Sequence, residues 1–277
     1  MDRWLGLVPA ALLLTAPPSL FAQGEPVSLR YTASQLNCAR FFEISESRIL
    51  TEAGRSEQQQ TTGRRGVWRF KAAPERGGIA LEGWLDSLAL WRRLRASVVR
   101  PDTDGLVGGR YRGVLTPAGM YQSHRAPFIP PEVAELADMT TALTDMLPRL
   151  PLQRLRPGQA WTDSAGLTIR RLADSGMSGV PLHRFHLDDR RSTNAAEVPG
   201  DTTVIRLRQT SEEQGTFVWH PSVGLIRRER QIIHRTTVPA RGIVKQTVRS
   251  RIEQRITLTR DLSLPPEITG DCPQPRG

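Results

Sequence analysis

The chain has 277 residues, of which 38% are hydrophobic and 6% aromatic, and its formal net charge at pH 7 is +10. This length fits one large β domain or two small ones, and the hydrophobic fraction is sufficient for a core. Few aromatic residues and arginines spread along the whole chain argue against nucleic-acid binding.

The positive charge is carried almost entirely by arginine, because Lys71 and Lys245 are the only lysines among 38 basic residues. Two explanations remain open at this point. A genome that favours Arg codons produces the bias without any functional meaning. Alternatively, the arginines form a surface that meets anions such as phosphorylated headgroups or acidic envelope proteins.

The first 22 residues have the pattern of a secretory signal peptide. Arg3 supplies a positive charge, Trp4 to Ala16 is an uncharged apolar run, and Ala22 offers a small residue for cleavage. The run is about 13 residues long, whereas a membrane-spanning helix needs roughly 20. We therefore expect export to the periplasm or the exterior, with no transmembrane segment after cleavage, and a single domain over residues 23–277.

The two cysteines lie near the two ends of that domain. In an exported chain, two cysteines pair more often than not, so we expect a disulfide between Cys38 and Cys272. Two separate thiols are the alternative. A CxxC redox motif is absent from the sequence.

Alternating patterns predict β-strands through the first half of the mature chain. Val67 to Ala72 alternates so that Trp68 and Phe70 face inward. The segment 79–91 fits helical spacing as well as strand spacing, and we favour a strand that returns from a turn at 74–78. Further strands are expected at residues 27–32, 40–51, 110–115 and 120–124.

One helix is expected between two prolines, because Pro131 suits a helix start and Pro148 forces an end. Its predicted range is 131–147. Apolar residues share one face of it: Val133, Leu136, Ala137, Leu143, Met146 and Leu147.

The second half again predicts strands, near residues 167–172, 181–187, 203–209, 215–220, 225–237 and 244–258. The last has the clearest alternation, with Val248, Ile252 and Ile256 on one face and arginines on the other. The fold class predicted is mainly β, an antiparallel sheet with one amphipathic helix packed on it.

No motif predicts catalysis, a metal or a cofactor. His183 and His186 are three residues apart, so in a strand their imidazoles point to opposite faces. Asp102 to Gly105 has a glycine too early for a calcium loop, and Gly176 to Gly179 lacks the spacing of a nucleophile elbow. We therefore assign no catalytic residue and no cofactor, and leave open an enzyme site assembled from distant residues.

Four short segments carry a family resemblance: Trp84 to Leu88, Gly109 to Gly113, Leu147 to Leu152 and Pro157 to Trp161. With the single helix between them, the chain resembles uncharacterised exported bacterial proteins whose fold is similar to the periplasmic lipoprotein carriers. The resemblance implies a strongly curved antiparallel sheet, an incomplete barrel, with the helix on its concave side. The carriers hold acyl chains there, but they have several helices where this chain has one.

The leading functional hypothesis is a non-enzymatic envelope protein that binds a hydrophobic or amphiphilic, lipid-like ligand, with rim arginines pairing to anionic headgroups. The residues expected to line its ligand site are Trp84, Leu136, Leu143 and Met146. The alternative is an exported interaction or scaffold module that binds another envelope protein. A hydrolase is the third hypothesis.

Overall fold

One large antiparallel sheet dominates the computed structural model, which describes residues 24–95, 97–144, 146–177, 179–199, 204–240 and 246–263. The long strands are β1 (Arg40–Ala53), β2 (Ser56–Glu75), β3 (Gly78–Leu94), β10 (Val180–Pro199), β11 (Val204–His220), β12 (Gly224–Val238) and β13 (Val248–Arg260). The short strands are β4 (Ser97–Val99), β5 (Tyr111–Leu115), β6 (Tyr121–Arg125), β7 (Ala160–Thr162), β8 (Thr168–Arg171) and β9 (Ser175–Met177).

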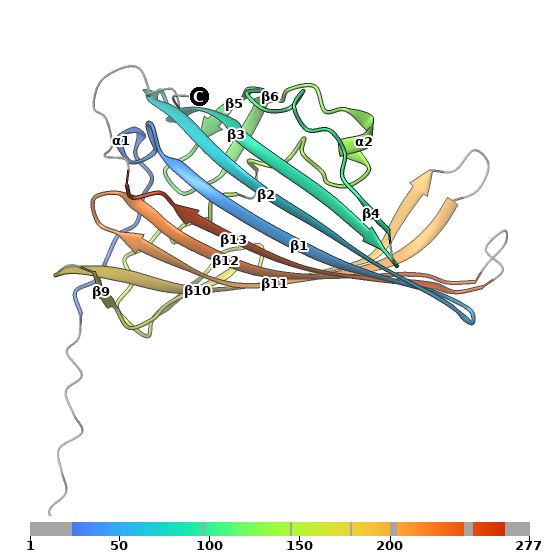
Figure 1. Cartoon of the computed structure of the whole chain (residues 1–277). Coiled ribbons are helices and arrows are strands. Elements are labelled where there is room, and N and C mark those ends of the chain that lie inside the picture. The colour runs from blue at the N-terminus through green and yellow to red at the C-terminus, as the bar shows by residue number, and fades with distance from the viewer. Residues whose placement is uncertain are drawn as a thin grey trace, which may run out of the picture.

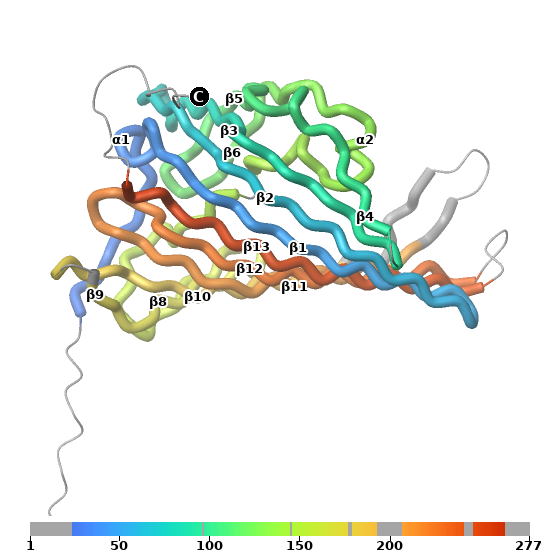
Figure 2. Tube along the Cα trace, in the orientation of Figure 1, coloured from blue at the N-terminus to red at the C-terminus, as the bar shows by residue number. Residues whose placement is uncertain are grey.

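The sheet order is β6-β5-β3-β2-β1-β13-β12-β11-β10-β8-β7, with β4 added to β3 and β9 added to β10. The central pair joins the first and last long strands, from Phe41 opposite Arg260 to Ala53 opposite Val248. The outermost strands β6 and β7 do not pair with each other, so the sheet is not closed into a barrel. The predicted fold class is confirmed, and Figures 1 and 2 show the sheet twisting and curving along its length.

The core lies on one face of this sheet, which we call the inner face. Phe41, Trp68, Phe70, Phe185 and Phe217 point there and are at most 1% exposed. Trp68 and Phe70 therefore face inward as the alternation predicts. The residues between β5 and β8 pass over this face and cover part of it, while the long strands continue beyond the covering segments (Figure 1).

The predicted helix over 131–147 is wrong in length. It begins at Pro131 but ends at Ala134, as the single turn α2 (Pro131–Ala134). Asp138 explains part of the difference, because its side chain accepts hydrogen bonds from the backbone N–H groups of Thr140 and Thr141 at 2.9 and 3.3 Å. Such side-chain bonds give the backbone an alternative to the helix, and β-branched threonines favour helices weakly.

The strand predicted over 27–32 is also wrong. Only Val27 forms a bridge, to Leu155, and Tyr31 donates its backbone N–H to Pro117 outside any ladder. The short helix α1 (Ala33–Leu36) follows, with Thr32 as its N-cap. The segment therefore crosses the end of the sheet instead of extending it.

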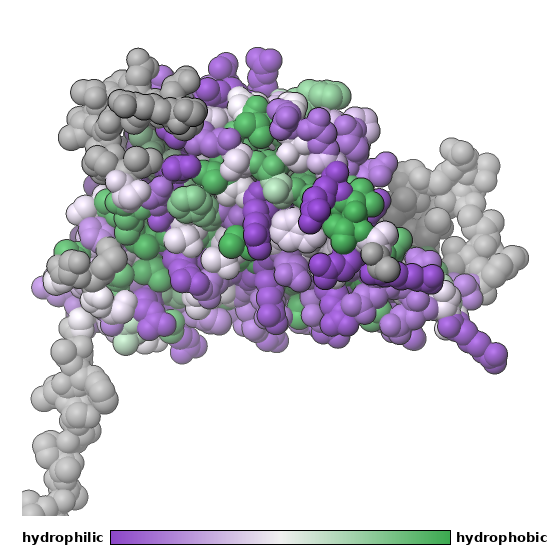
Figure 3. All heavy atoms as spheres, viewed as in Figure 1, coloured by the Kyte–Doolittle hydropathy of each residue, from purple (hydrophilic) through white to green (hydrophobic). Residues whose placement is uncertain are grey.

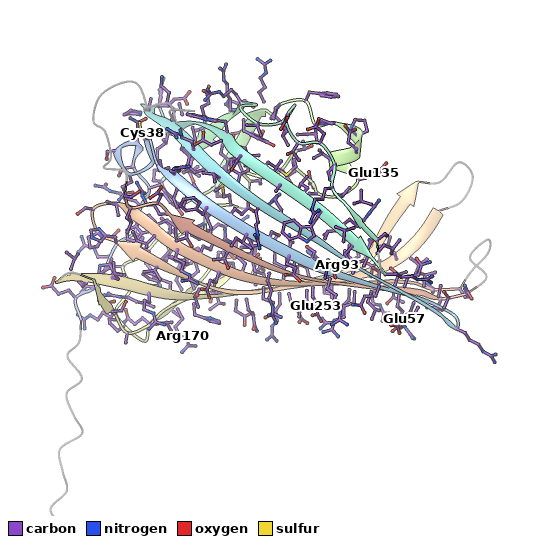
Figure 4. All side chains as sticks on the ribbon, in the orientation of Figure 1. Cys38, Glu57, Arg93, Glu135, Arg170 and Glu253 are labelled. Atoms are coloured by element: carbon purple, nitrogen blue, oxygen red, sulfur yellow. The ribbon has the colours of Figure 1, made fainter. Side chains whose placement is uncertain are left out.

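Cys38 is buried just after α1, at one end of the molecule, whereas Glu57 and Arg93 lie at the other end (Figure 4). Cys272 and the predicted signal peptide lie outside the described residues, so the disulfide and the cleavage remain predictions. Within the described ranges, no helix has the length and apolar character needed to cross a membrane.

Candidate ligand-binding groove

The inner face of four central strands forms the floor of a groove. Cross-strand pairing on β1, β13 and β12 arranges its residues in four rows: Glu43, Leu258 and Arg228; Ser45, Ile256 and Arg230; Ser47, Gln254 and Ile232; Ile49, Ile252 and His234. We call the Glu43 row the inner row and the Ile49 row the outer row. Strand β2 contributes Thr62, Gly63 and Arg64 along one side.

A roof covers this floor, formed by the non-helical residues that follow α2. Its lining residues are Leu136, Ala137, Asp138, Thr141, Ala142 and Met146. Arg228 donates from Nη1 to the Met146 carbonyl at 3.0 Å, and Arg64 donates from Nη1 to the Met139 sulfur at 3.0 Å. Floor and roof enclose a pocket of about 410 Å³, a volume within the range usual for small-molecule sites.

The inner row is buried, whereas the outer row is partly exposed. Glu43, Leu258 and Arg228 are 5%, 2% and 6% exposed, whereas His234 at the other end is exposed. The inner end is therefore closed and the outer end is open to solvent. The open end is bordered by the isoleucines of β1 and β13, so its floor is largely apolar on that side.

At the inner end, Glu43 is held by two donors from β2. Arg64 forms a short ion pair with one carboxylate oxygen, and Trp68 donates its indole N–H to the other at 2.7 Å. The alternation of β1 places Glu43 on the same face as Phe41, and these two donors offset the cost of burying its charge.

On the opposite side of the floor, Glu213 of β11 bridges two arginines of β12. Arg230 donates from Nε and Nη2 to its two oxygens at 2.8 and 2.7 Å, and Arg228 donates from Nη2 at 3.1 Å. Burial alone raises the pKa of the Glu213 carboxyl, but the hydrogen bonds and charges of Arg230 and Arg228 outweigh it and lower that pKa. Glu213 is therefore ionised at neutral pH.

His234 in the outer row is uncharged at neutral pH. Burial lowers the pKa of its imidazole, and the charge of Arg230 lowers it further against the opposing charge of Glu213. The imidazole therefore adds no net charge to the groove.

A second pocket of about 290 Å³ lies on the other side of Arg228 and Arg230, which line both pockets. Its other walls include Tyr121, Leu147 and Leu187. The arginines and Glu213 therefore stand as a partition between two compartments of the inner face.

The four residues that the sequence placed around a ligand are divided by the structure. Leu136 and Met146 line the 410 Å³ pocket. Leu143 is 3% exposed and packs behind it, since a Cβ on Gly83 would lie 2.9 Å from its side chain.

Trp84 lies on the outer face of β3 and does not line this groove. Its neighbours Gly83 and Leu85 point inward, and strand alternation sends the indole to the other side. There it donates to Asp86 at 3.0 Å, and the Arg110 guanidinium stacks 3.7 Å from its ring.

Sequence reasoning missed the charged residues of the floor. In β1, Phe41, Glu43 and Ser45 alternate onto the inner face, so a buried polar strip could have been predicted once a strand was expected at 40–51. The partners could not, because Arg64 and Glu213 come from strands whose register the sequence does not reveal.

His183 and His186 lie on opposite faces of β10, as predicted. His183 is 8% exposed and its Nδ1 lies 3.2 Å from Asp174, which also pairs with Arg171. His186 borders a shallow pocket elsewhere on the sheet. In the part of the chain that the structure describes, no three His, Cys, Asp or Glu residues are grouped to hold a metal ion.

No protein-family model matches the chain, and no curated protein matches it in sequence. Among solved structures it is similar to lipovitellin, studied for lipid–protein interactions, at 12% identity and a TM-score of 0.43 over 81% of this chain. The match spans only 25% of the lipovitellin chain.

Two bacterial structures are similar over most of their own length. A DUF1329 family protein from Desulfovibrio piger ATCC 29098 has 9% identity and a TM-score of 0.18, covering 84% of this chain and 90% of that one. An exported protein with a YmcC-like fold from Bacteroides fragilis NCTC 9343 has 13% identity and a TM-score of 0.17, covering 78% and 98%. All three TM-scores are below 0.5.

Proposed function

We propose that this chain is an exported, non-enzymatic protein that binds a lipid-like amphiphile in the groove of its inner face. The observation that carries the proposal is the 410 Å³ pocket, which has apolar side chains on both its floor and its roof and an open end. Export rests on the pattern of the first 22 residues.

An amphiphile suits this pocket better than a wholly apolar molecule. The apolar part can contact Ile232, Ile252 and Ile256 below and Leu136 and Met146 above. The same pocket contains buried ionic groups, which an entirely hydrocarbon ligand would leave facing an apolar neighbour. A molecule with one polar and one apolar end matches both kinds of wall.

The test is whether the protein carries and exchanges such a ligand. Protein purified from its native host is extracted with organic solvent, and the extract is analysed by mass spectrometry. Delipidated protein is then titrated with a fluorescent fatty-acid probe. We expect a bound amphiphile and saturable uptake of about one probe per chain. No extractable amphiphile together with no uptake would refute the proposal.

A second function, binding to another envelope protein, is favoured by a separate observation on the outer face. Phe42 and Ile44 of β1 are 42% and 52% exposed there, and Arg40 lies over the Phe42 ring. The face seen in Figure 3 carries hydrophobic side chains in patches among hydrophilic ones. A Phe42→Ser, Ile44→Ser variant that loses a stoichiometric partner in pull-downs while retaining probe uptake would support this function.

A further inference from the structure

The inner end of the groove holds a guanidinium that is poorly satisfied. Arg64 has one strong acceptor, Glu43, and its Nη1 faces the sulfur of Met139, which is a weak acceptor. Its Nε is buried and has no hydrogen-bond partner among the described residues. The Arg64 side chain is 13% exposed and lines the pocket.

A second buried donor, the hydroxyl of Tyr111, also lacks a hydrogen-bond partner among the described residues. Tyr111 lies on β5 and is 1% exposed. It interacts electrostatically with Arg64, Asp138 and Glu43, which all line the pocket. Burial raises the pKa of this phenol well above its ordinary value, so it remains a donor at any physiological pH.

Donors buried without acceptors cost free energy, and an acceptor that arrives with a ligand removes that cost. If hydrocarbon entered the inner end first, it would leave the Arg64 Nε–H unpaired. If a polar head entered first, its oxygen would pair with that donor, and the chain would lie over Ile256 and Ile232 towards the outer row.

The charge around the groove decides which kind of head fits. Three arginines, Arg64, Arg228 and Arg230, face three carboxylates, those of Glu43, Asp138 and Glu213. His234 adds no charge, because the pKa of its imidazole is lowered. A carboxylate or phosphate at the inner end would add a second anion beside Glu43, which like-charge repulsion in a poorly solvated site disfavours.

We propose that the inner end of the groove binds the uncharged, hydrogen-bond-accepting head of an amphiphile, of the acylglycerol or fatty-alcohol kind, through Arg64. The head lies between Glu43, Arg64 and the roof, and the chain runs along the isoleucines to the open end. This inference rests on the proposed function, and it replaces the anionic headgroup expected from the arginine content.

The first experiment compares three amphiphiles with the same 12-carbon chain below their micellar concentrations. Delipidated protein at pH 8 is titrated with monododecanoylglycerol, dodecanoate and dodecyltrimethylammonium in competition with a fluorescent probe. We expect the uncharged acylglycerol to bind at least about 10-fold more tightly than either ion, because the ammonium head offers Arg64 no acceptor and the carboxylate adds a repulsion with Glu43. Equal or tighter binding of dodecanoate would overturn this inference and leave the proposed function standing. Failure of all three to bind would overturn the proposed function itself.

The second experiment removes the donors one at a time. Arg64→Lys keeps a positive charge beside Glu43 but removes Nε and the planar fork. We expect it to weaken acylglycerol binding about 3- to 10-fold and to reduce the discrimination against dodecanoate. The matched control is Arg65→Lys, because Arg65 is the next residue on β2 and lies on the outer face over Trp91. It should leave both affinities unchanged.

Tyr111→Phe separates a ligand role from a structural one. If the hydroxyl serves the ligand, its removal weakens acylglycerol binding and leaves the melting temperature of the free protein unchanged or raised, since an unpartnered buried donor is lost. A lowered melting temperature with unchanged affinity would assign the hydroxyl to the fold. If neither Arg64→Lys nor Tyr111→Phe alters the preference for the uncharged head, the inference is refuted.

Discussion

Replacing Glu213 with glutamine tests whether the partition between the two compartments stabilises the protein. The substitution keeps the shape of the side chain and removes its charge. Arg228 and Arg230 have side chains that are 7% and 9% exposed, so both guanidinium groups would remain buried after losing the Glu213 charge. Breaking a buried ion pair costs about 3–5 kcal/mol, and a charge-assisted hydrogen bond contributes about 1.5–3 kcal/mol.

We expect Glu213→Gln to lower the free energy of unfolding by about 3 kcal/mol, because the amide oxygen can still accept from one of the two arginines. At about 2–4 °C per kcal/mol for a chain of this size, the melting temperature should fall by roughly 6–12 °C. Urea denaturation followed by circular dichroism measures the difference. The control is Glu229→Gln. The Glu229 and Arg227 side chains form an ion pair and are 50% and 53% exposed, so this substitution should change stability by less than about 0.5 kcal/mol.

The stability difference between the wild type and Glu213→Gln should depend on pH. Because the folded-state pKa of Glu213 is lowered, its contribution is fully present above the unfolded-state value of about 4.3 and is lost as the pH falls through the folded value. The gap between wild type and Glu213→Gln should therefore be constant from about pH 6 to 8 and shrink below about pH 4. Equal stabilities at pH 7, or a gap that persists undiminished at pH 2, would contradict this account of the floor.

Three further predictions concern packing and the ligand. Gly215→Ala should destabilise the protein by more than about 2 kcal/mol in thermal melts, because the new Cβ would meet the Glu229 carbonyl at 2.3 Å. The control Gly105→Ala should be neutral, because a Cβ there meets no atom within 4 Å. Equal melting temperatures for the two variants would show that β11 and β12 can move apart to accommodate the methyl group without loss of stability. Trp84→Ala should lower stability through its lost contacts on the outer face and leave probe affinity unchanged, whereas a loss of affinity would return Trp84 to the site. Lengthening the acyl chain of the ligand by two CH₂ groups should tighten binding about 15-fold, at about 0.8 kcal/mol per group. Ile252→Ser should reduce this gain. If the affinity of the variant depended on chain length as strongly as that of the wild type, the chain would not lie over Ile252.

The helix over 131–147 shows where reasoning from apolar spacing fails. The spacing correctly indicated that Val133, Leu143 and Met146 are buried, but burial does not require a helix. The non-helical roof packs against the curved sheet and also buries side chains, at irregular intervals. The hydrogen bonds that Asp138 accepts within the roof favour this non-helical path, and a hydrophobic pattern gives no indication of them.

Strand existence was more predictable than strand length. Two strands expected at 203–209 and 215–220 are one continuous strand, β11. The intervening residues are polar, and Gly215 read as a strand start. In the structure Gly215 is a point of close approach, because the backbone of Glu229 leaves no room for a side chain.

The site was predictable only in part, because its chemistry depends on register. Leu136 and Met146 were identified from one apolar pattern along a single segment. By contrast, the ion pairs of the floor join Glu43 to Arg64 and Glu213 to Arg230 across neighbouring strands. A shift of one residue in either pairing would move a partner to the opposite face, and the sequence contains no direct record of that register.

The central claim is that the space between roof and floor is the ligand site. The most direct test fills that space with Ala142→Trp, a substitution at a roof residue that lines the pocket, and measures probe uptake. The control is Ala89→Trp, at an exposed position on the outer face of β3. Both variants should melt near the wild-type temperature, while Ala142→Trp alone loses saturable binding. Undiminished binding by a folded Ala142→Trp variant would place the ligand elsewhere and contradict the account.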